Sequence, residues 1–312
     1  MKPEILTLTH EIYQRALTDI DREFSNHHVF REANPDALIE KLAPTVRGIA
    51  TSGHKGASAA LIARLPKLEV IACFGVGVDA IDLKAAATRG IPVTNTPDVL
   101  TDEVADLAIG LMLASSRRLP KGDRFVRAGK WLDGPMELTN RVSGARLGIL
   151  GMGRIGRAIA ARAAAFKMTI GWHGPRPKDL PYRYYEDLVA LARDSDFLIV
   201  ACPGGAATRH RVDAAVLAAL GASGTLVNVS RGSVVDEAAL VKALQDGALG
   251  AAALDVFADE PRAPAALLAM DNVVLSPHQG SATHQTRAAM GQLVVDNLRA
   301  HFAGQPLLTR VV

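Results

Sequence analysis

The sequence LGILGMGRIGRAIA, at residues 147–160, decides the fold of this chain. An apolar run leads directly into Gly151, Gly153 and Gly156, spaced G-x-G-x-x-G, and an alanine-rich helical segment follows. Glycine permits a tight turn at the first position, close approach of a pyrophosphate at the second, and close packing of helix on strand at the third. A tight turn in an unrelated α/β protein is the simpler alternative, but the strand before and the helix after favour a dinucleotide-binding loop.

Apolar runs with the length of strands continue around this loop. Six of them lie in the second part of the chain, at residues 146–151, 168–173, 197–202, 225–230, 251–257 and 272–278. Their continuous apolar character is typical of parallel strands that helices cover on both faces. Six such strands joined through helices predict a doubly wound, Rossmann-type α/β domain with a parallel sheet.

The first third of the chain shows the same alternation on a smaller scale. Runs at residues 4–9, 47–52, 68–74 and 91–96, with helical segments between them, predict a second parallel α/β sheet. The adjacent His27 and His28 are expected in a solvated surface turn. Further along, we expect a helix from Thr101 to about Arg118, an irregular arm up to Asn140, and a final helix near residues 284–303.

The composition excludes several classes of protein. With 35 basic and 32 acidic residues the net charge is only +3, and no basic run points to nucleic acid. No apolar segment is long enough to span a bilayer, and no histidine or cysteine spacing predicts a metal site. Cys73 and Cys202 lie in apolar runs, which favours buried thiols in a reducing cytoplasm over a disulfide framework.

The segment GWHGPRPK, at residues 171–178, bears on the choice of dinucleotide. An NAD site usually has Asp or Glu at the end of the strand after the glycine loop, and this segment has neither. Arg176 can instead clamp a 2′-phosphate, with His173 close by. NADP is therefore favoured and NAD stays possible, because Arg176 as a solvated loop residue is the open alternative.

Three polar residues follow the ends of later predicted strands. Arg231 follows TLVNVS, Glu260 follows LDVFAD, and His278 ends NVVLSPH. Ligands of open α/β sheets bind at these carboxyl ends, so the three side chains can meet. Reduction of a 2-oxo acid needs a proton donor for the developing alkoxide, a carboxylate that orients it, and a cation that polarises the carbonyl. His278, Glu260 and Arg231 suit these roles. Taken singly, a satisfied strand-end histidine, a capping acid and an Arg231–Asp255 pair remain alternatives.

The glycine loop, Arg231, Glu260 and His278 belong to longer motifs, and through them the chain resembles the D-isomer-specific 2-hydroxyacid dehydrogenases. Within that family it is most similar to the hydroxypyruvate/glyoxylate reductases and hydroxyphenylpyruvate reductases. The resemblance covers nearly the whole chain and rests on FGVGVDAIDL (74–83), GIPVTNTPDVLTDEVADLAIGLMLA (90–114), LGILGMGRIGRAIA (147–160), NVSRGSVVDEAALVKAL (228–244), LDVFADEP (254–261) and LSPHQGSATHQTR (275–287). It implies NADPH-dependent reduction of glyoxylate, hydroxypyruvate and related 2-oxo acids to D-2-hydroxy acids.

The resemblance also implies roles for individual residues. Arg231, Glu260 and His278 would be catalytic. Backbone N–H groups of Val76 and Gly77 would hold the substrate carboxylate, and Arg231 and His278 would also contact the substrate. The implied cofactor contacts are Thr101, Gly151, Gly153, Arg154, Ile155, Gly156, His173, Arg176, Cys202, Pro203, Thr208, Val229, Ser230, Asp255 and Gly280. One departure weakens the 2′-phosphate interpretation, since Gly174 and Pro175 stand where such reductases often carry Ser or Arg.

The implied organisation is a discontinuous, flavodoxin-like lid domain at residues 1–98 and 286–312 around a cofactor domain at residues 99–285. The two would close over substrate, and a homodimer would form through the cofactor domain with residues 101–140 at the interface. Two alternatives stay open. One is a formate or phosphite dehydrogenase that uses NAD, and the other is a dinucleotide-sensing protein without catalysis on the same scaffold.

Overall fold

The computed structural model describes residues 2–312 and divides into two compact units. The first unit comprises residues 2–100 and 282–312, and the second comprises Thr101–Ser281. The borders expected from the sequence fell after residues 98 and 285. Within residues 2–312, no helix combines the length and the hydrophobicity that crossing a membrane requires.

The first unit is built on a five-stranded parallel sheet in the order β2-β1-β3-β4-β5. Its strands are β1 (Glu4–Thr7), β2 (Ser25–His28), β3 (Val46–Ser52), β4 (Val70–Phe74) and β5 (Val93–Thr94). Its helices are α1 (Gln14–Glu23), α2 (Pro35–Leu42), α3 (Ala59–Arg64), α4 (Leu83–Thr88) and α12 (His284–Phe302), with a 3₁₀ turn η1 (Val29–Arg31). The strand order is that of flavodoxin, which confirms the predicted fold of this part.

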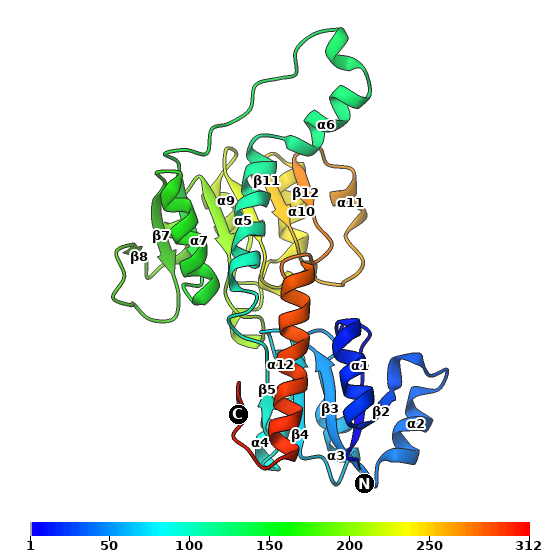
Figure 1. The fold of residues 1–312 in the computed structure, drawn as a ribbon. Coiled ribbons are helices and arrows are strands. Elements are labelled where there is room, and N and C mark those ends of the chain that lie inside the picture. Colours follow the sequence, from blue (N-terminus) through cyan, green and yellow to red (C-terminus); the bar gives the residue numbers. More distant parts are fainter. Residues whose placement is uncertain (1) are drawn as a thin grey trace. The chain divides into compact units, whose positions relative to one another are not determined.

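Helix α12 returns the C-terminal segment to this unit and packs beside α1 (Figure 1). The helices approach so closely at Gly291 that a Cβ there would lie 2.7 Å from Cβ of Ala16. Across the same contact, Arg299 Nε donates to Glu23 Oε2 at 2.5 Å. A segment about 280 residues away in sequence therefore completes the core of the first unit.

Strand β2 is an addition that the sequence pattern did not predict. Ser25–His28 pairs in parallel with β1, so the expected surface turn at His27 and His28 is wrong. Both histidines are half-buried, and His28 Nε2 lies 2.9 Å from Asp21 Oδ1. The segment SNHH has no apolar residue, so its sequence shows no strand periodicity, and only pairing with β1 gives it extended structure.

The second unit contains a seven-stranded parallel sheet in the order β12-β11-β10-β9-β6-β7-β8. Its strands are β6 (Arg146–Leu150), β7 (Thr169–His173), β8 (Arg183–Tyr184), β9 (Phe197–Val200), β10 (Thr225–Asn228), β11 (Ala251–Leu254) and β12 (Val273–Leu275). Its helices are α5 (Thr101–Ser116), α6 (Leu119–Arg127), α7 (Arg154–Ala165), α8 (Leu188–Arg193), α9 (Ala214–Leu220), α10 (Glu237–Gln245) and α11 (Ala265–Leu268). Short 3₁₀ turns are η2 (Lys130–Leu132), η3 (Ala206–Thr208) and η4 (Gly232–Val234).

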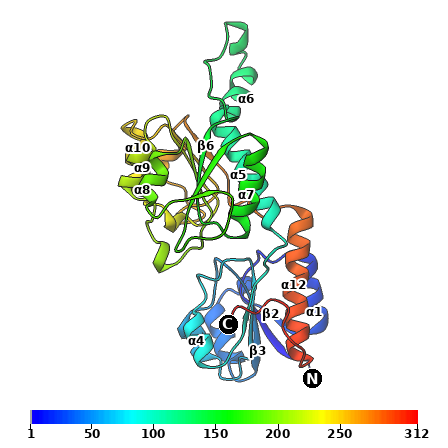
Figure 2. The ribbon, with the colours of Figure 1, turned by 90° about the vertical axis from the view of Figure 1, so that its left-hand side faces the viewer.

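This sheet is the predicted doubly wound arrangement, with helices on both faces (Figure 2). The chain leaves β6 toward β7 on one side and later returns to place β9 on the other. The strand order therefore reverses at β6, and ligands of such sheets bind outside the carboxyl ends at this point. The two-residue strand β8 makes seven strands where six were predicted, because it is too short to show a pattern.

The arm after α5 extends away from the sheet of the second unit (Figure 2). Residues 119–127 form helix α6 here, so the expectation of an irregular arm is wrong for that part. Helix α6 buries no side chain, and Pro120 and Gly122 near its start are residues that a sequence pattern assigns to turns and loops. Along the arm Trp131, Leu132 and Leu138 are 67%, 94% and 96% exposed.

Candidate active site

The glycine loop joins β6 to α7, and its three glycines have three different surroundings. A Cβ on Gly151, whose φ is +101°, would lie 2.6 Å from the Cα of Cys202. A Cβ on Gly156 would lie 2.1 Å from the carbonyl oxygen of Gly151. A Cβ on Gly153 would meet no atom within 4 Å.

Gly153 therefore faces open space at the beginning of α7. It is the N-cap residue of this twelve-residue helix, and no side chain caps the first N–H groups. Uncapped N–H groups and the helix dipole together favour an anion. The loop thus fits the pyrophosphate of a dinucleotide, with the backbone of Arg154 and Ile155 in the first turn of α7.

The end of β7 carries the side chains expected near the adenine ribose. His173 is buried, and its Nδ1 lies 2.9 Å from the carbonyl oxygen of Tyr185. Its Nε2 lies 2.9 Å from Nη2 of Arg211, a residue that the sequence analysis did not single out. Arg176 is exposed, while Lys178 Nζ donates to the carbonyl oxygen of Met152 in the glycine loop at 2.8 Å.

The predicted catalytic histidine and glutamate form a direct pair. His278 Nδ1 lies 2.8 Å from Glu260 Oε2, and the two side chains are 30% and 20% exposed. Oε1 of Glu260 accepts the backbone N–H of Phe257 at 3.0 Å. An ionised carboxylate can only accept a hydrogen bond, so the nitrogen that faces it must donate. Nδ1 of His278 therefore carries a proton.

Arg231 lies three residues beyond β10 and is partly buried. Its Nη1 donates to the carbonyl oxygen of Ser230 at 2.9 Å. Asn228 fixes this turn from both sides, since its Nδ2 donates to the Arg231 carbonyl at 3.0 Å and its Oδ1 accepts the Ser230 N–H at 3.1 Å. The strand end thus holds the backbone from which the guanidinium projects.

Asp255, at the end of β11, organises the loop that presents His278. One carboxylate oxygen accepts the Ser276 hydroxyl at 2.6 Å and the Gln279 N–H at 2.7 Å, and the other accepts the Gly280 N–H at 2.9 Å. Its carbonyl oxygen accepts the His278 N–H at 2.8 Å. Burial raises the pKa of Asp255 although these hydrogen bonds oppose the shift. His278 itself takes a left-handed backbone with φ of +52°, which a non-glycine residue adopts only where its surroundings impose it.

The remaining predicted cofactor contacts of the second unit border the same strand ends. Ser230 Oγ donates to the carbonyl of Cys202 at 2.7 Å, and Thr208 Oγ1 donates to that of Pro203 at 2.7 Å. Burial raises the pKa of the Cys202 thiol to about 11, so it stays protonated at neutral pH. Val229 follows β10 and Thr101 begins α5.

In the first unit, the predicted carboxylate-binding loop follows β4. Thr96 fixes it by accepting the Gly75 N–H on Oγ1 at 3.1 Å, and Asn95 Nδ2 donates to the Val76 carbonyl at 2.9 Å. Among the hydrogen bonds of residues 2–312, none is donated by the backbone N–H of Val76 or Gly77. These two donors can therefore take an anionic ligand.

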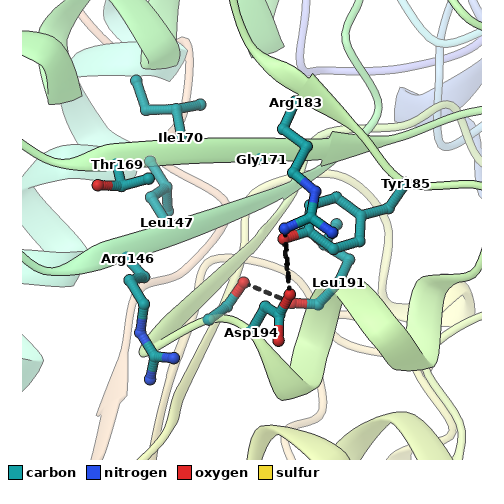
Figure 3. A pocket seen from close by; sticks show the side chains of 10 residues that line it. Arg146, Leu147, Thr169, Ile170, Gly171, Arg183, Tyr185, Leu191 and Asp194 are labelled. Carbon is teal, nitrogen blue, oxygen red and sulfur yellow. Dashed lines mark hydrogen bonds and ion pairs between the residues drawn. The ribbon is translucent and has the colours of Figure 1, made fainter.

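A cavity of about 300 Å³ opens at the other end of the sheet, beside the amino ends of β6 and β7 (Figure 3). Tyr185 and the charged side chains that line it are already paired, since the Tyr185 hydroxyl donates to Asp194 Oδ2 at 2.8 Å and Arg146 Nη2 donates to Asp196 Oδ1 at 2.6 Å. The cavity lies away from the carboxyl strand ends and contributes none of the predicted catalytic residues.

Comparison with known proteins places these features in a family. Residues 109–280 match the family model for the NAD binding domain of D-isomer specific 2-hydroxyacid dehydrogenases. The chain is 50% identical over 295 residues to glyoxylate/hydroxypyruvate reductase A of Arabidopsis thaliana, covering 94% of each chain. It is 47% identical over 295 residues to hydroxyphenylpyruvate reductase of Plectranthus scutellarioides, again covering 94% of each.

A solved structure shows the same fold over the whole length. It is the NADPH-dependent glyoxylate/hydroxypyruvate reductase of Sinorhizobium meliloti, in complex with NADP and malonate. Its TM-score is 0.92 at 44% sequence identity, and the match covers 100% of this chain and 97% of that one. The resemblance seen in the sequence motifs is thereby confirmed.

Proposed function

Since this chain belongs to the D-isomer specific 2-hydroxyacid dehydrogenase family, we propose that it reduces small 2-oxo acids such as glyoxylate and hydroxypyruvate to D-2-hydroxy acids with NADPH. The observation that carries this proposal is the 2.8 Å pair of His278 and Glu260 at the strand ends of a unit with an open glycine loop. Relatives with reductase names at 50% and 47% identity support it.

The proposed chemistry divides between cofactor and protein. A nicotinamide held at this site would supply the hydride for C2 of the oxo acid. Because Nδ1–H of His278 is directed to Glu260, the proton for the alkoxide oxygen would come from Nε2. Glu260 orients the ring and stabilises the imidazolium form by its charge. Arg231 would polarise the carbonyl and bind the carboxylate, and cannot itself give up a proton.

Each unit also supplies backbone groups for binding. The N–H groups of Val76 and Gly77 in the first unit are proposed to hold the substrate carboxylate. In the second unit, Gly153 and the first turn of α7 would hold the pyrophosphate. Val229, Ser230, Asp255 and Gly280 would border the nicotinamide, and Cys202, Pro203 and Thr208 the rest of the nucleotide.

The preference for NADPH rests on charge. A carboxylate at this strand end would repel a 2′-phosphate, and residues 171–178 contain none. The related Sinorhizobium meliloti enzyme is NADPH-dependent. NAD remains a usable second cofactor in this proposal, because the pyrophosphate and nicotinamide contacts are common to both dinucleotides.

We further propose a homodimer formed through the arm at residues 118–140 of the second unit. Trp131, Leu132 and Leu138 expose most of their apolar surface along this arm, as an uncovered interface does. A cytoplasmic location is the matching proposal, supported by two buried cysteines that are not in disulfides.

The decisive experiment follows loss of nicotinamide absorbance with purified protein. NADPH and NADH are each tested with glyoxylate, hydroxypyruvate, pyruvate and hydroxyphenylpyruvate. The proposal expects turnover with hydroxypyruvate or glyoxylate, and faster with NADPH. Oxidation of formate or phosphite with NAD, or cofactor binding without turnover of any acid, would replace it with the dehydrogenase or the sensing alternative.

A further inference from the structure

The guanidinium of Arg211 stands at the carboxyl end of β7 with most of its hydrogen-bonding capacity unused. Arg211 is exposed, and one of its five N–H groups donates to Nε2 of His173 at 2.9 Å. No carboxylate within residues 2–312 forms an ion pair with it, and its side chain makes no second hydrogen bond there. Its positive charge is therefore not compensated by the protein.

His173 holds this guanidinium in place and cannot itself serve an anion in this arrangement. The Tyr185 carbonyl can only accept, so Nδ1 of His173 carries the proton at 2.9 Å from it. A guanidinium can only donate, so Nε2 is the unprotonated acceptor. With both ring nitrogens committed, the buried imidazole is neutral and orients Arg211.

The backbone of Arg211 is equally fixed. Its N–H donates to the Thr208 carbonyl at 3.2 Å, and the next residue, Val212, donates to the Val234 carbonyl at 3.0 Å. An arginine whose backbone and guanidinium are both held by hydrogen bonds loses less conformational entropy on binding a ligand than an arginine on a free loop. Arg176, by contrast, is exposed and makes no hydrogen bond or ion pair within the described chain.

One hydrogen bond and one electrostatic effect place Arg211 near the nucleotide loop. His173 ends β7, the neighbour of β6, and the glycine loop starts where β6 ends. Arg211 also acts electrostatically on the thiol of Cys202, where it lowers the pKa against the larger effect of burial. Cys202 is the residue that a side chain on Gly151 would strike. The guanidinium thus lies at the end of β7, next to the strand that leads into the glycine loop, and its charge acts on Cys202.

We propose that Arg211, positioned by His173, is the residue that selects the adenosine 2′-phosphate of NADP. This inference rests on the proposed function and deepens it, by transferring the main 2′-phosphate contact from Arg176 to Arg211. An uncompensated guanidinium with four remaining donors matches a dianionic phosphate at the strand end where an NAD enzyme would carry a carboxylate.

The test measures binding of 2′,5′-ADP and of 5′-AMP by calorimetry, so that it does not depend on turnover. Arg211→Gln is compared with Arg209→Gln, an equal charge change on an exposed residue of the same loop. We expect Arg211→Gln to weaken 2′,5′-ADP about 10- to 100-fold, from the loss of charge-assisted hydrogen bonds. Binding of 5′-AMP and both affinities of Arg209→Gln should stay within about twofold, which is the scatter expected of surface changes.

A second pair of variants tests the positioning role of His173. Gln can accept from Arg211 and donate to the Tyr185 carbonyl, whereas Leu can do neither. His173→Leu should reduce the preference for 2′,5′-ADP over 5′-AMP, and His173→Gln should restore much of it. Equal loss of both ligands in His173→Leu would mean a purely structural residue.

The outcomes separate this inference from the proposed reaction. The wild-type protein could reduce hydroxypyruvate with NADPH while Arg211→Gln keeps full selectivity for 2′,5′-ADP. That result overturns the inference about Arg211 and leaves the proposed reaction unaffected. Arg211-dependent binding of 2′,5′-ADP without reduction of any 2-oxo acid does the reverse. Failure of the wild-type protein to favour 2′,5′-ADP over 5′-AMP also overturns the inference.

Discussion

Nδ1 of His278 lies 2.8 Å from Oε2 of Glu260, while Oε1 of the same carboxylate takes the backbone N–H of Phe257. Both carboxylate oxygens of Glu260 therefore accept a hydrogen bond. Through Glu260, the imidazole of His278 is held against the loop between β11 and α11. The left-handed backbone of His278 and the Asp255 hydrogen bonds fix the other end of this contact.

Replacement of His278 by Ala removes the proposed proton donor. We expect kcat for hydroxypyruvate reduction to fall about 10²- to 10⁴-fold, the usual contribution of a general acid. Affinity for NADP, measured by calorimetry, should stay close to that of the wild type because the glycine loop is untouched. Near-normal turnover would assign proton donation to another group.

Glu260→Gln tests the two-sided acceptor. The side chain of Gln has one acceptor oxygen, where Glu260 has two. It can therefore replace the hydrogen bond to His278 or the one to Phe257, but not both. We expect kcat to fall about 10- to 100-fold, the effect of losing one hydrogen bond to a charged group. A circular dichroism melt serves as the folding control, and unchanged kcat in a folded variant contradicts the orienting role.

The two glycines of the cofactor loop should separate binding from folding. A Cβ on Gly153 meets nothing within 4 Å, so Gly153→Ala should fold normally and bind NADP more weakly. A Cβ on Gly156 would lie 2.1 Å from a backbone oxygen, so Gly156→Ala should lower Tm, because backbone there must shift. Calorimetry and thermal melts on both variants check this, and equal effects of the two would contradict it.

The ion pair between α1 and α12 predicts an acid-dependent loss of stability. The hydrogen bond from Arg299 lowers the pKa of Glu23 below its ordinary 4.5, although burial opposes the shift. A carboxyl whose folded-state pKa is lowered stabilises the fold fully above pH 4.5 and loses this contribution as pH falls through the folded-state value. Wild type should exceed Glu23→Gln by up to about 1 kcal/mol in unfolding free energy at pH 7.

The difference between these two proteins should shrink below pH 4.5 and vanish in stronger acid. Urea denaturation at several pH values from neutral to acid measures it. A difference that stays constant through this range would mean that the two proteins differ through packing and not through charge.

The exposed arm predicts a change of oligomeric state. Leu132→Glu combined with Leu138→Glu places two charges on side chains that are 94% and 96% exposed, so folding should be preserved. If the arm forms the proposed interface, sedimentation velocity should show a shift from dimer to monomer, because buried unpaired charge opposes association. Leu268→Glu, at a 65% exposed residue outside the arm, is the matched control.

The sequence by itself determined the features whose physics is local. Continuous apolar runs of strand length identify β6, β9 and β10 whatever surrounds them, and the glycine spacing identifies the loop because only glycine fits positions 151 and 156. Positions after strand ends also put Arg231, Glu260 and His278 at one edge of the sheet, since parallel strands end together.

Tertiary structure alone decided the features that depend on distant partners. Strand β2 and the two-residue β8 exist because a neighbouring strand pairs with them. The hydrogen bond between His173 and Arg211, 38 residues apart, fixes the tautomer of His173 and holds the guanidinium of Arg211 in place. In the sequence, Arg211 is one of several basic residues in the same loop. Sequence records which groups can donate or accept, but only their distances in the folded chain decide which of them are satisfied and which remain for a ligand.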